Sequence, residues 1–240
     1  MILRAAASTD VGLRRKANED RYAVSPELGL YLVADGMGGH TAGQVASGLA
    51  AEAVLEAVQA LEGASSSLAE KLRYAVAAAN RSIFTRSTTE PQLTGMGTTL
   101  VAMLAAGGRA ALAHVGDSRA YLIRGGRIRQ LTDDHSIVGE LLRRNEISED
   151  DARDHPHRHV LTRALGVRPG VEPDLAELTP SPGDVFVLCS DGLTNHVEDE
   201  EIAKIVGDPP DLQEACDRLV DLANGRGGED NTTIILAQAT

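Results

Sequence analysis

Four aspartates far apart in the sequence each stand where an apolar run of strand length meets a turn. They are Asp35, Asp117, Asp191 and Asp230. If these strand ends converge, two carboxylates about 4 Å apart would repel each other by about 4 kcal/mol at an effective dielectric constant of about 20. Divalent cations remove this conflict, and oxygen ligands without Cys or His select hard ions such as Mg²⁺ or Mn²⁺. The pattern therefore predicts a site for such ions.

Two such ions that share carboxylates, roughly 3.5–4 Å apart, are how hydrolytic sites hold an activated water against a phosphorus centre. Arg15 could then bind the phosphate oxygens, because a guanidinium offers paired hydrogen bonds that a lysine cannot reproduce. A single Asp-Gly pair is more often a plain turn, but four aspartates at strand ends favour a site. The turn 36–39 could instead cradle a nucleotide phosphate, although it lacks the Walker lysine and the dinucleotide spacing.

Hydrophobic periodicity predicts the elements that must position these residues. Strands are expected at 2–10, 30–34, 98–106, 109–115, 120–124, 127–132, 171–178, 185–190 and from 232 onward. Helices are expected at 41–61, 68–83, 199–206 and 212–223, the first two opened by capping boxes at 41–44 and 67–70.

The glycine pairs 107–108 and 125–126 predict hairpins, in one antiparallel meander that is interrupted at 116–118. Antiparallel strands with two helical pairs predict a layered α+β domain, a sheet or sheet pair covered by helices.

The segment 133–156 is strongly polar and runs into a patch of histidines, which are His155, His157 and His159. We interpret it as an excursion over the surface, of the kind that often lies beside binding sites. A solvated loop is the default reading for at least two of the three histidines.

Composition excludes several classes of function. The 240 residues carry 23 Lys plus Arg against 35 Asp plus Glu, a formal charge of −12, which disfavours binding to nucleic acid. No run approaches the roughly 18 apolar residues of a membrane span. Cys189 and Cys216 fall in apolar settings and are predicted to be reduced core residues of a cytosolic protein. The length allows one large domain or two small ones, and we favour one.

Taken in order, seven motifs resemble those of the metal-dependent protein serine/threonine phosphatases of the PP2C type, in their compact bacterial form. The matching segments are 15–20 (RKANED), 35–40 (DGMGGH), 95–99 (GMGTT), 116–119 (GDSR), 133–136 (DDHS), 189–193 (CSDGL) and 228–231 (GEDN). The resemblance implies one catalytic domain over residues 1–240, a four-layer αββα sandwich of two antiparallel sheets flanked by helical pairs. It also implies a flap at about 136–155 and a metal site at one end of the sandwich.

The resemblance further implies roles for individual residues. Asp35 would bridge two Mn²⁺ or Mg²⁺ ions, the Gly36 carbonyl would complete the second, and Asp191 and Asp230 would hold the first. Asp117 would share a third, weaker ion with Asp191 under the flap.

Around the metals, the resemblance implies that Arg15 binds the substrate phosphate. It implies that Asp20 orients water from outside the ligand set, and we group Glu19 and Asn231 with it.

The implied reaction is direct attack by a metal-activated water on phosphoserine or phosphothreonine. Animal members carry a histidine, resembling a general acid, where this chain has Met37. His40, His159 and a water on the metal are the alternative proton donors. The implied partners are phosphorylated proteins and a serine/threonine kinase, and we expect a cytoplasmic monomer that makes no membrane contact.

Two other functions remain open at this stage. A catalytically silent module of the same fold could bind metal or a phosphorylated partner. An acidic calcium-binding protein ranks lower, because the chain lacks the alternating aspartates of an EF-hand loop.

Overall fold

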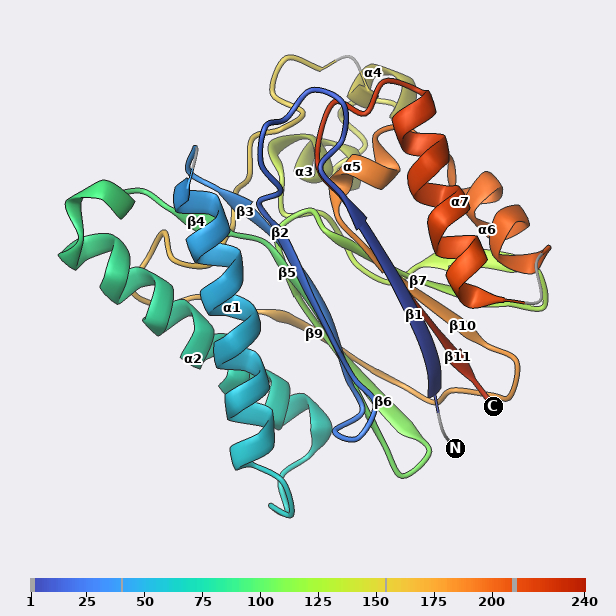
Figure 1. Cartoon of the computed structure of the whole chain (residues 1–240), viewed down its shortest axis with the longest axis horizontal. Helices are drawn as coiled ribbons and strands as arrows, with labels where there is room; N and C mark the ends of the chain where they lie inside the picture. The colour runs from blue at the N-terminus through green and yellow to red at the C-terminus, as the bar shows by residue number, and fades with distance from the viewer. Residues whose placement is uncertain (1–2, 40, 154, 209–210) are drawn as a thin grey trace.

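A computed structural model of the chain describes residues 3–39, 41–153, 155–208 and 211–240. Two antiparallel sheets lie face to face, and helices cover both outer faces (Figure 1). The first sheet has, in spatial order, β1 (Leu3–Asp10), β11 (Thr232–Ala239), β10 (Val185–Cys189), β7 (Arg119–Arg124) and β8 (Arg127–Gln130). The second has β2 (Asp20–Ser25), β3 (Leu30–Met37), β5 (Leu100–Ala106), β6 (Arg109–Val115) and β9 (Asp174–Leu178), with the short β4 (Gly97–Thr98) paired to β3.

The central strands are buried on both faces, which explains their continuous apolar runs. In β3, Tyr31 and Val33 point into the space between the sheets, whereas Leu30 and Leu32 point toward helices. The same alternation sends Phe186 of β10 inward. Since side chains alternate across a strand, both faces need apolar residues when each is covered.

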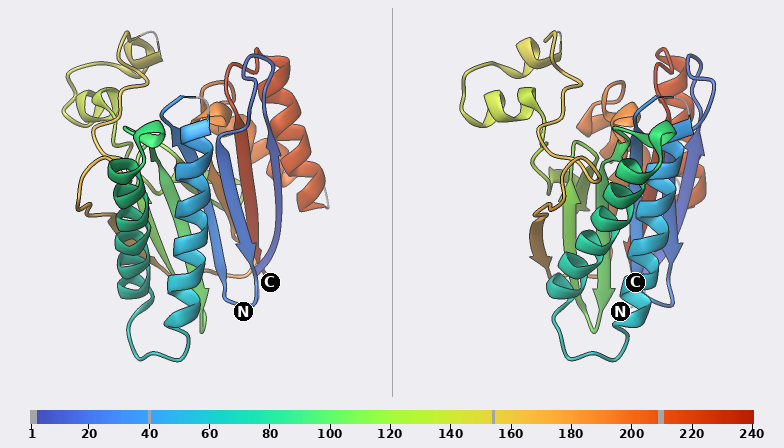
Figure 2. Two further views of the ribbon diagram at one scale, coloured as in Figure 1. Left: turned by 60° about the vertical axis from the view of Figure 1, so that its left-hand side comes forward. Right: turned by 90° about the vertical axis from the view of Figure 1, so that its left-hand side faces the viewer.

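Two helical pairs form the outer layers. The long helices α1 (Thr41–Ala60) and α2 (Leu68–Thr89) lie side by side on the second sheet (Figure 2). The shorter α6 (Asp199–Gly207) and α7 (Leu212–Gly225) cover the first. The four-layer α+β sandwich that the resemblance implied is confirmed.

The predicted flap contains two short helices, α3 (Ile137–Arg143) and α4 (Glu149–Arg153). Figure 2 shows this segment, in yellow-green, standing away from the sandwich at one end. The short α5 (Asp191–Thr194), which directly follows β10, lies at the same end (Figure 1). A single 3₁₀ turn, η1 (Pro91–Leu93), follows α2.

Three details of the sequence prediction were wrong or missing. The interruption predicted at 116–118 is confirmed, but the two hairpins do not form one meander, because β5 and β6 pair in the second sheet while β7 and β8 pair in the first. Residues 116–118 therefore carry the chain from one sheet to the other. Within the described residues, no hydrogen bonds form the capping box predicted at 41–44. Thr41 is already helical, and the Gln44 amide donates to the Asn18 carbonyl. Strand β2 was not predicted.

The second capping box and both hairpins are confirmed. The Ser67 side chain accepts from Glu70 N–H, and the Glu70 carboxylate accepts from Ser67 N–H. All four glycines of the hairpin turns have positive φ, between +57° and +76°, which is the conformation that these tight turns require.

Candidate active site

Strand pairing brings the predicted aspartates to one end of the sandwich. Asp20, the first residue of β2, lies directly opposite Asp35 near the end of β3. Asp191 follows β10 and Asp230 precedes the antiparallel β11, so these two also share an end. Asp117 lies in the turn between β6 and β7. Residues that span most of the sequence thus meet where the strands stop.

Threonine hydroxyls fix the position of Asp35. Its N–H donates to Thr99 Oγ1 (3.0 Å), and its carbonyl accepts from Thr98 Oγ1 (2.8 Å) and from Thr99 N–H (2.9 Å). Thr99 Oγ1 also lies 2.7 Å from Ser118 Oγ. Since Ser118 adjoins Asp117, this hydroxyl pair ties the two aspartates together through their backbones.

The carboxyls are half-buried among like charges. Burial, followed by the charges of Asp20 and Asp191, raises the pKa of Asp35 well above its usual value. Burial and the charge of Asp191 do the same to the pKa of Asp117. Burial and the charge of Asp230 raise the pKa of Asp191. These shifts mark an anionic cluster whose charge the surrounding chain does not balance.

Asp191 shows most directly that the cluster fits a hard cation. Its Oδ2 accepts from Asn195 Nδ2 (3.1 Å), but its buried Oδ1 has no hydrogen-bond partner in the described part of the chain. A buried carboxylate oxygen without a partner is costly unless a cation or water binds it. Carboxylate and carbonyl oxygens are the ligands that Mg²⁺ and Mn²⁺ prefer.

Arg15 lies beside Asp230 at the rim of this cluster. Its Nη2 is 2.6 Å from Asp230 Oδ2, and the other oxygen of Asp230 accepts from Asn231 N–H (2.8 Å). Burial lowers the pKa of Arg15, but the charge and hydrogen bond of Asp230 outweigh it and the pKa is raised. With 51% of its side chain exposed, Arg15 can contact an incoming anion.

The aspartates lie at one end of the sandwich, but their carboxylate oxygens are not all within ligand distance of a single position. Over the described ranges, no three of them bring one oxygen each within 4.8 Å of one another; the group that meets this limit is His114, His135 and Asp174. Both oxygens of Asp230 are engaged by Arg15 and by its neighbour's N–H, which holds this carboxylate at the rim.

Asn231, predicted to lie outside the ligand set, fastens the loop that carries Arg15. Its Nδ2 donates to the carbonyls of Val11 (2.9 Å) and Ala17 (3.0 Å), and its Oδ1 accepts from Glu19 N–H (2.8 Å). It is only 4% exposed. The contacts are to backbone groups, so Asn231 positions residues 11–19 as a unit.

Gly36 lies in a tightly packed part of the site. A Cβ there would overlap the Gly43 carbonyl at the start of α1 and would lie 2.7 Å from the Glu19 carbonyl. A Cβ on Gly43 would in turn overlap the Glu19 carboxylate. The glycines therefore allow helix α1 and Glu19 to approach the end of β3.

Asp20 belongs to a buried hydroxyl network. Its Oδ2 accepts from Ser190 Oγ (2.8 Å), and Ser190 Oγ accepts from Thr233 N–H (2.9 Å). Its Oδ1 is buried and has no partner among the described residues. Burial, opposed by the Thr233 and Ser190 hydrogen bonds, raises the pKa of Asp20 to about 6.

The described histidines of the predicted patch differ in their surroundings. His159 is exposed, and its charge partly opposes the rise in the pKa of Asp191, which places it near the cluster. His40 lies outside the described residues. His155 and His157 contact each other, with ring centroids 5.7 Å apart.

Sequence reasoning assigned no role to the hydroxyls that hold the aspartates in place. These are Thr98, Thr99, Ser118 and Ser190. The sequence did contain a local indication of these hydroxyls, because a Ser or Thr stands beside several of the aspartates or at the start of the neighbouring strand.

Comparisons with known proteins agree with this geometry. Residues 8–232 match the family described as Protein phosphatase 2C. Serine/threonine phosphatase stp of Listeria monocytogenes is 43% identical over 237 residues, covering 96% of this chain and 93% of that protein. The crystal structure of the Mycobacterium tuberculosis serine/threonine phosphatase PstP/Ppp has a TM-score of 0.90 at 42% identity and covers 99% of both chains. The catalytic domain of serine/threonine protein phosphatase PstP in complex with two manganese ions has a TM-score of 0.88 at 41% identity, covering 99% of this chain and 98% of that one.

Proposed function

Because the chain belongs to the protein phosphatase 2C family, we propose that it is a metal-dependent phosphatase of phosphoserine and phosphothreonine in proteins. The observation that carries this proposal is the meeting of half-buried, mutually repelling carboxylates with an exposed arginine at one end of the sandwich. A structural cluster of carboxylates would be neutralised by its own chain, whereas this one retains oxygens for a ligand.

The residues that would hold two Mn²⁺ or Mg²⁺ ions are those at the strand ends. Asp35 and the Gly36 carbonyl would contribute from β3, and Asp191 and Asp230 from either side of the β10–β11 pair. Asp117 would contribute to a third, weaker site. When bound, such ions make a water molecule nucleophilic at neutral pH and stabilise the charge that develops on the phosphoryl group.

The chain's own residues bind and orient the substrate. Arg15 would exchange part of its contact with Asp230 for two phosphate oxygens, since a guanidinium can form paired hydrogen bonds with them. Asp20, held by Ser190, would accept a hydrogen bond from water at the edge of the cluster. His159 would supply the proton to the leaving alkoxide, because it is exposed and lies close enough to affect Asp191.

We further propose that residues 1–240 form one catalytic domain that acts as a monomer in the cytoplasm. Its substrates would be phosphoproteins, with a serine/threonine kinase as the opposing enzyme. Across the described residues, the longest helices are too short or too polar to cross a membrane.

The test is hydrolysis of a phosphothreonine peptide by the purified chain. We expect activity with Mn²⁺, loss of activity in EDTA and recovery when Mn²⁺ is added back in excess. A phosphotyrosine peptide of the same sequence is the control and should be cleaved much more slowly. Binding of the phosphothreonine peptide without turnover at saturating Mn²⁺ would instead assign the chain as a silent phosphoprotein-binding module.

A further inference from the structure

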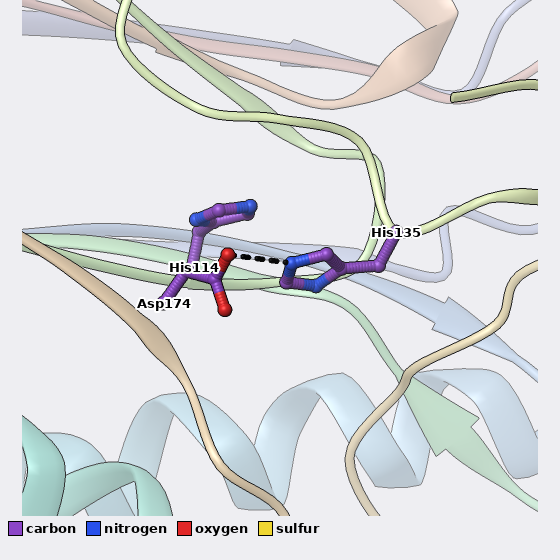
Figure 3. Close-up of side chains that lie close together, drawn as sticks. All are labelled: His114, His135 and Asp174. Atoms are coloured by element: carbon purple, nitrogen blue, oxygen red, sulfur yellow. Dashed lines mark ion pairs between the residues drawn. The ribbon is translucent and has the colours of Figure 1, made fainter. Parts of the chain in front are cut away.

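Beside the aspartate cluster lies a second group of polar side chains that the proposed reaction does not use. His114 and His135 are both buried, and their rings stack with centroids 4.4 Å apart and planes inclined by 21°. His135 Nε2 lies 3.3 Å from Asp174 Oδ2 (Figure 3). Asp174, the cross-strand neighbour of His114, also pairs with Arg163. We call these four residues the histidine cluster.

The histidine cluster is close enough to suggest a metal site, but its geometry opposes one. Gly116 N–H donates to His135 Nδ1 (3.1 Å), so the neutral ring carries its proton on Nε2, the atom that would have to bind the ion. A metal-binding lone pair lies in the plane of its ring, and two stacked rings do not direct theirs to one point. His114 Nε2 is taken by the Asp133 carbonyl (2.9 Å). These contacts indicate that the histidine cluster has a structural role, in which His135 connects the turn at Gly116 to the segment after Asp133.

That connection holds Gly116 on both of its backbone polar groups. Its N–H donates to the His135 ring, and its carbonyl accepts from His135 N–H (2.9 Å). Gly116 has φ +108°, and a Cβ there would lie 2.6 Å from Thr99 Cγ2, so the turn has no other residue type available to it. Asp117 follows directly. His135 thus sets the orientation of the backbone that leads into Asp117.

The same histidine joins the two arms of the flap. Residues 136–155 leave the sandwich immediately after His135, and the His135 carbonyl accepts from Thr162 N–H (2.8 Å) on the returning arm. Ser136 and Leu161 form an isolated β-bridge next to it. One residue therefore contacts the turn before Asp117, the start of the flap and its end.

We propose that His135 is a positioning residue, which fixes the turn carrying Asp117 to the base of the flap so that the carboxylate and the flap are placed together. The stacked ring of His114 holds the His135 ring in the orientation that accepts from Gly116. Asp174 Oδ2 lies 3.3 Å from His135 Nε2, an atom that has no hydrogen-bond partner among the described residues. Burial and the charge of His114 lower the pKa of His135 to about 4, which is consistent with a neutral ring at neutral pH.

This inference rests on the proposed function only for its kinetic readout, so its test has two arms. In His135→Phe, which keeps a ring but offers Gly116 no acceptor, we expect deuterium exchange of peptides covering 112–118 and 160–165 to accelerate at least tenfold. We expect kcat on a phosphothreonine peptide to fall roughly ten- to hundredfold, with KM changed less, since small displacements of a catalytic group have effects of this size. His135→Asn restores an acceptor near the position of Nδ1 and should recover most of both losses.

The matched control is Asp184→Asn, which breaks the ion pair between buried Asp184 and exposed Arg124 at the opposite end of β10. It should lower the melting temperature as His135→Phe does, yet leave kcat and the exchange of 112–118 near wild type. Equal kcat losses in the two variants at equal loss of melting temperature would overturn the proposal, and so would unchanged exchange in His135→Phe.

Zn²⁺ binding that disappears in His114→Phe would overturn it too, by assigning the cluster to a metal. An inactive wild-type chain would count against the proposed phosphatase, while the exchange data would still decide the role of His135.

Discussion

The two ends of β10 carry carboxylates in opposite electrostatic surroundings. Before the strand, Asp184 is 1% exposed and accepts from Arg124 Nε (2.7 Å), Arg124 Nη2 (2.6 Å) and Ser181 N–H (2.8 Å). The Arg124 hydrogen bonds lower the pKa of Asp184. After the strand, burial and the charge of Asp230 raise the pKa of Asp191. A carboxylate that serves stability is neutralised by its own chain, and one that serves a ligand is left with unmet charge.

The strongest test of this difference is Asp191→Ala. We expect kcat/KM on a phosphothreonine peptide to fall by about 10²–10³ or more, because removal of one electrostatic contributor to a transition state has effects of this size. Asp184→Asn, its counterpart at the other end of the strand, should retain activity within about twofold. Steady-state kinetics at saturating Mn²⁺ decide the matter, and full activity in Asp191→Ala would refute the site assignment.

Arginines accompany the carboxylates at both ends, and their substitution separates the two roles. Arg15→Lys should lower kcat/KM about 10–100-fold, chiefly by raising KM, because lysine cannot form paired hydrogen bonds with a phosphate. Arg124→Lys keeps a charge beside Asp184 and should leave both constants unchanged. An unaltered KM in Arg15→Lys would exclude this arginine from phosphate binding.

Stability should respond in the reverse order to activity. Asp184→Asn is expected to lose about 1–3 kcal/mol of unfolding free energy, since it weakens charged hydrogen bonds to a buried group. Asp191→Asn in EDTA should lose nothing or gain stability, because it removes a buried charge that repels its neighbours. Urea denaturation of the two variants measures this contrast, which fails if both are destabilised alike.

Asp117 tests whether every aspartate of the cluster acts alike. Asp117→Ala should reduce turnover about tenfold or more, as loss of an outer partner often does, while the tightest Mn²⁺ site keeps its affinity. Asp133→Ala, an exposed neighbour of the flap base, provides the control. Calorimetry that finds the tightest site lost in Asp117→Ala would contradict this division of roles.

The smallest expected effect is in the pH dependence of stability. Since the pKa of Asp184 is lowered by folding, its contribution is fully present above the unfolded value of about 3.9 and is lost as pH falls through the folded value. The difference in melting temperature between wild type and Asp184→Asn should therefore shrink from pH 6 to pH 3. A difference that grows over this range would show that another group is responsible.

The sequence predicted what local patterns record and missed what depends on distant pairing. Strands β3 and β10 were visible because both of their faces are buried, which gives continuous apolar runs that stop at an aspartate. Strand β2 was not, since it lies at a sheet edge and exposes Arg21 and Tyr22.

The sequence predicted an interruption at 116–118 but not a crossing between sheets, because a period of two residues does not say which sheet a strand joins. The contact of Arg15 with Asp230 spans 215 positions, so the placement of that carboxylate could not be read from its surrounding sequence.

The pairing of β1 with β11 has a consequence for the making of the protein. These strands join the first and last parts of the described chain, and Asn231 holds the loop that presents Arg15. During synthesis, β1 cannot pair with β11 until positions 230–239 have left the ribosome. Such long-range closure is slow. A nascent chain therefore leaves β1 unpaired and carries no assembled centre until β11 has emerged.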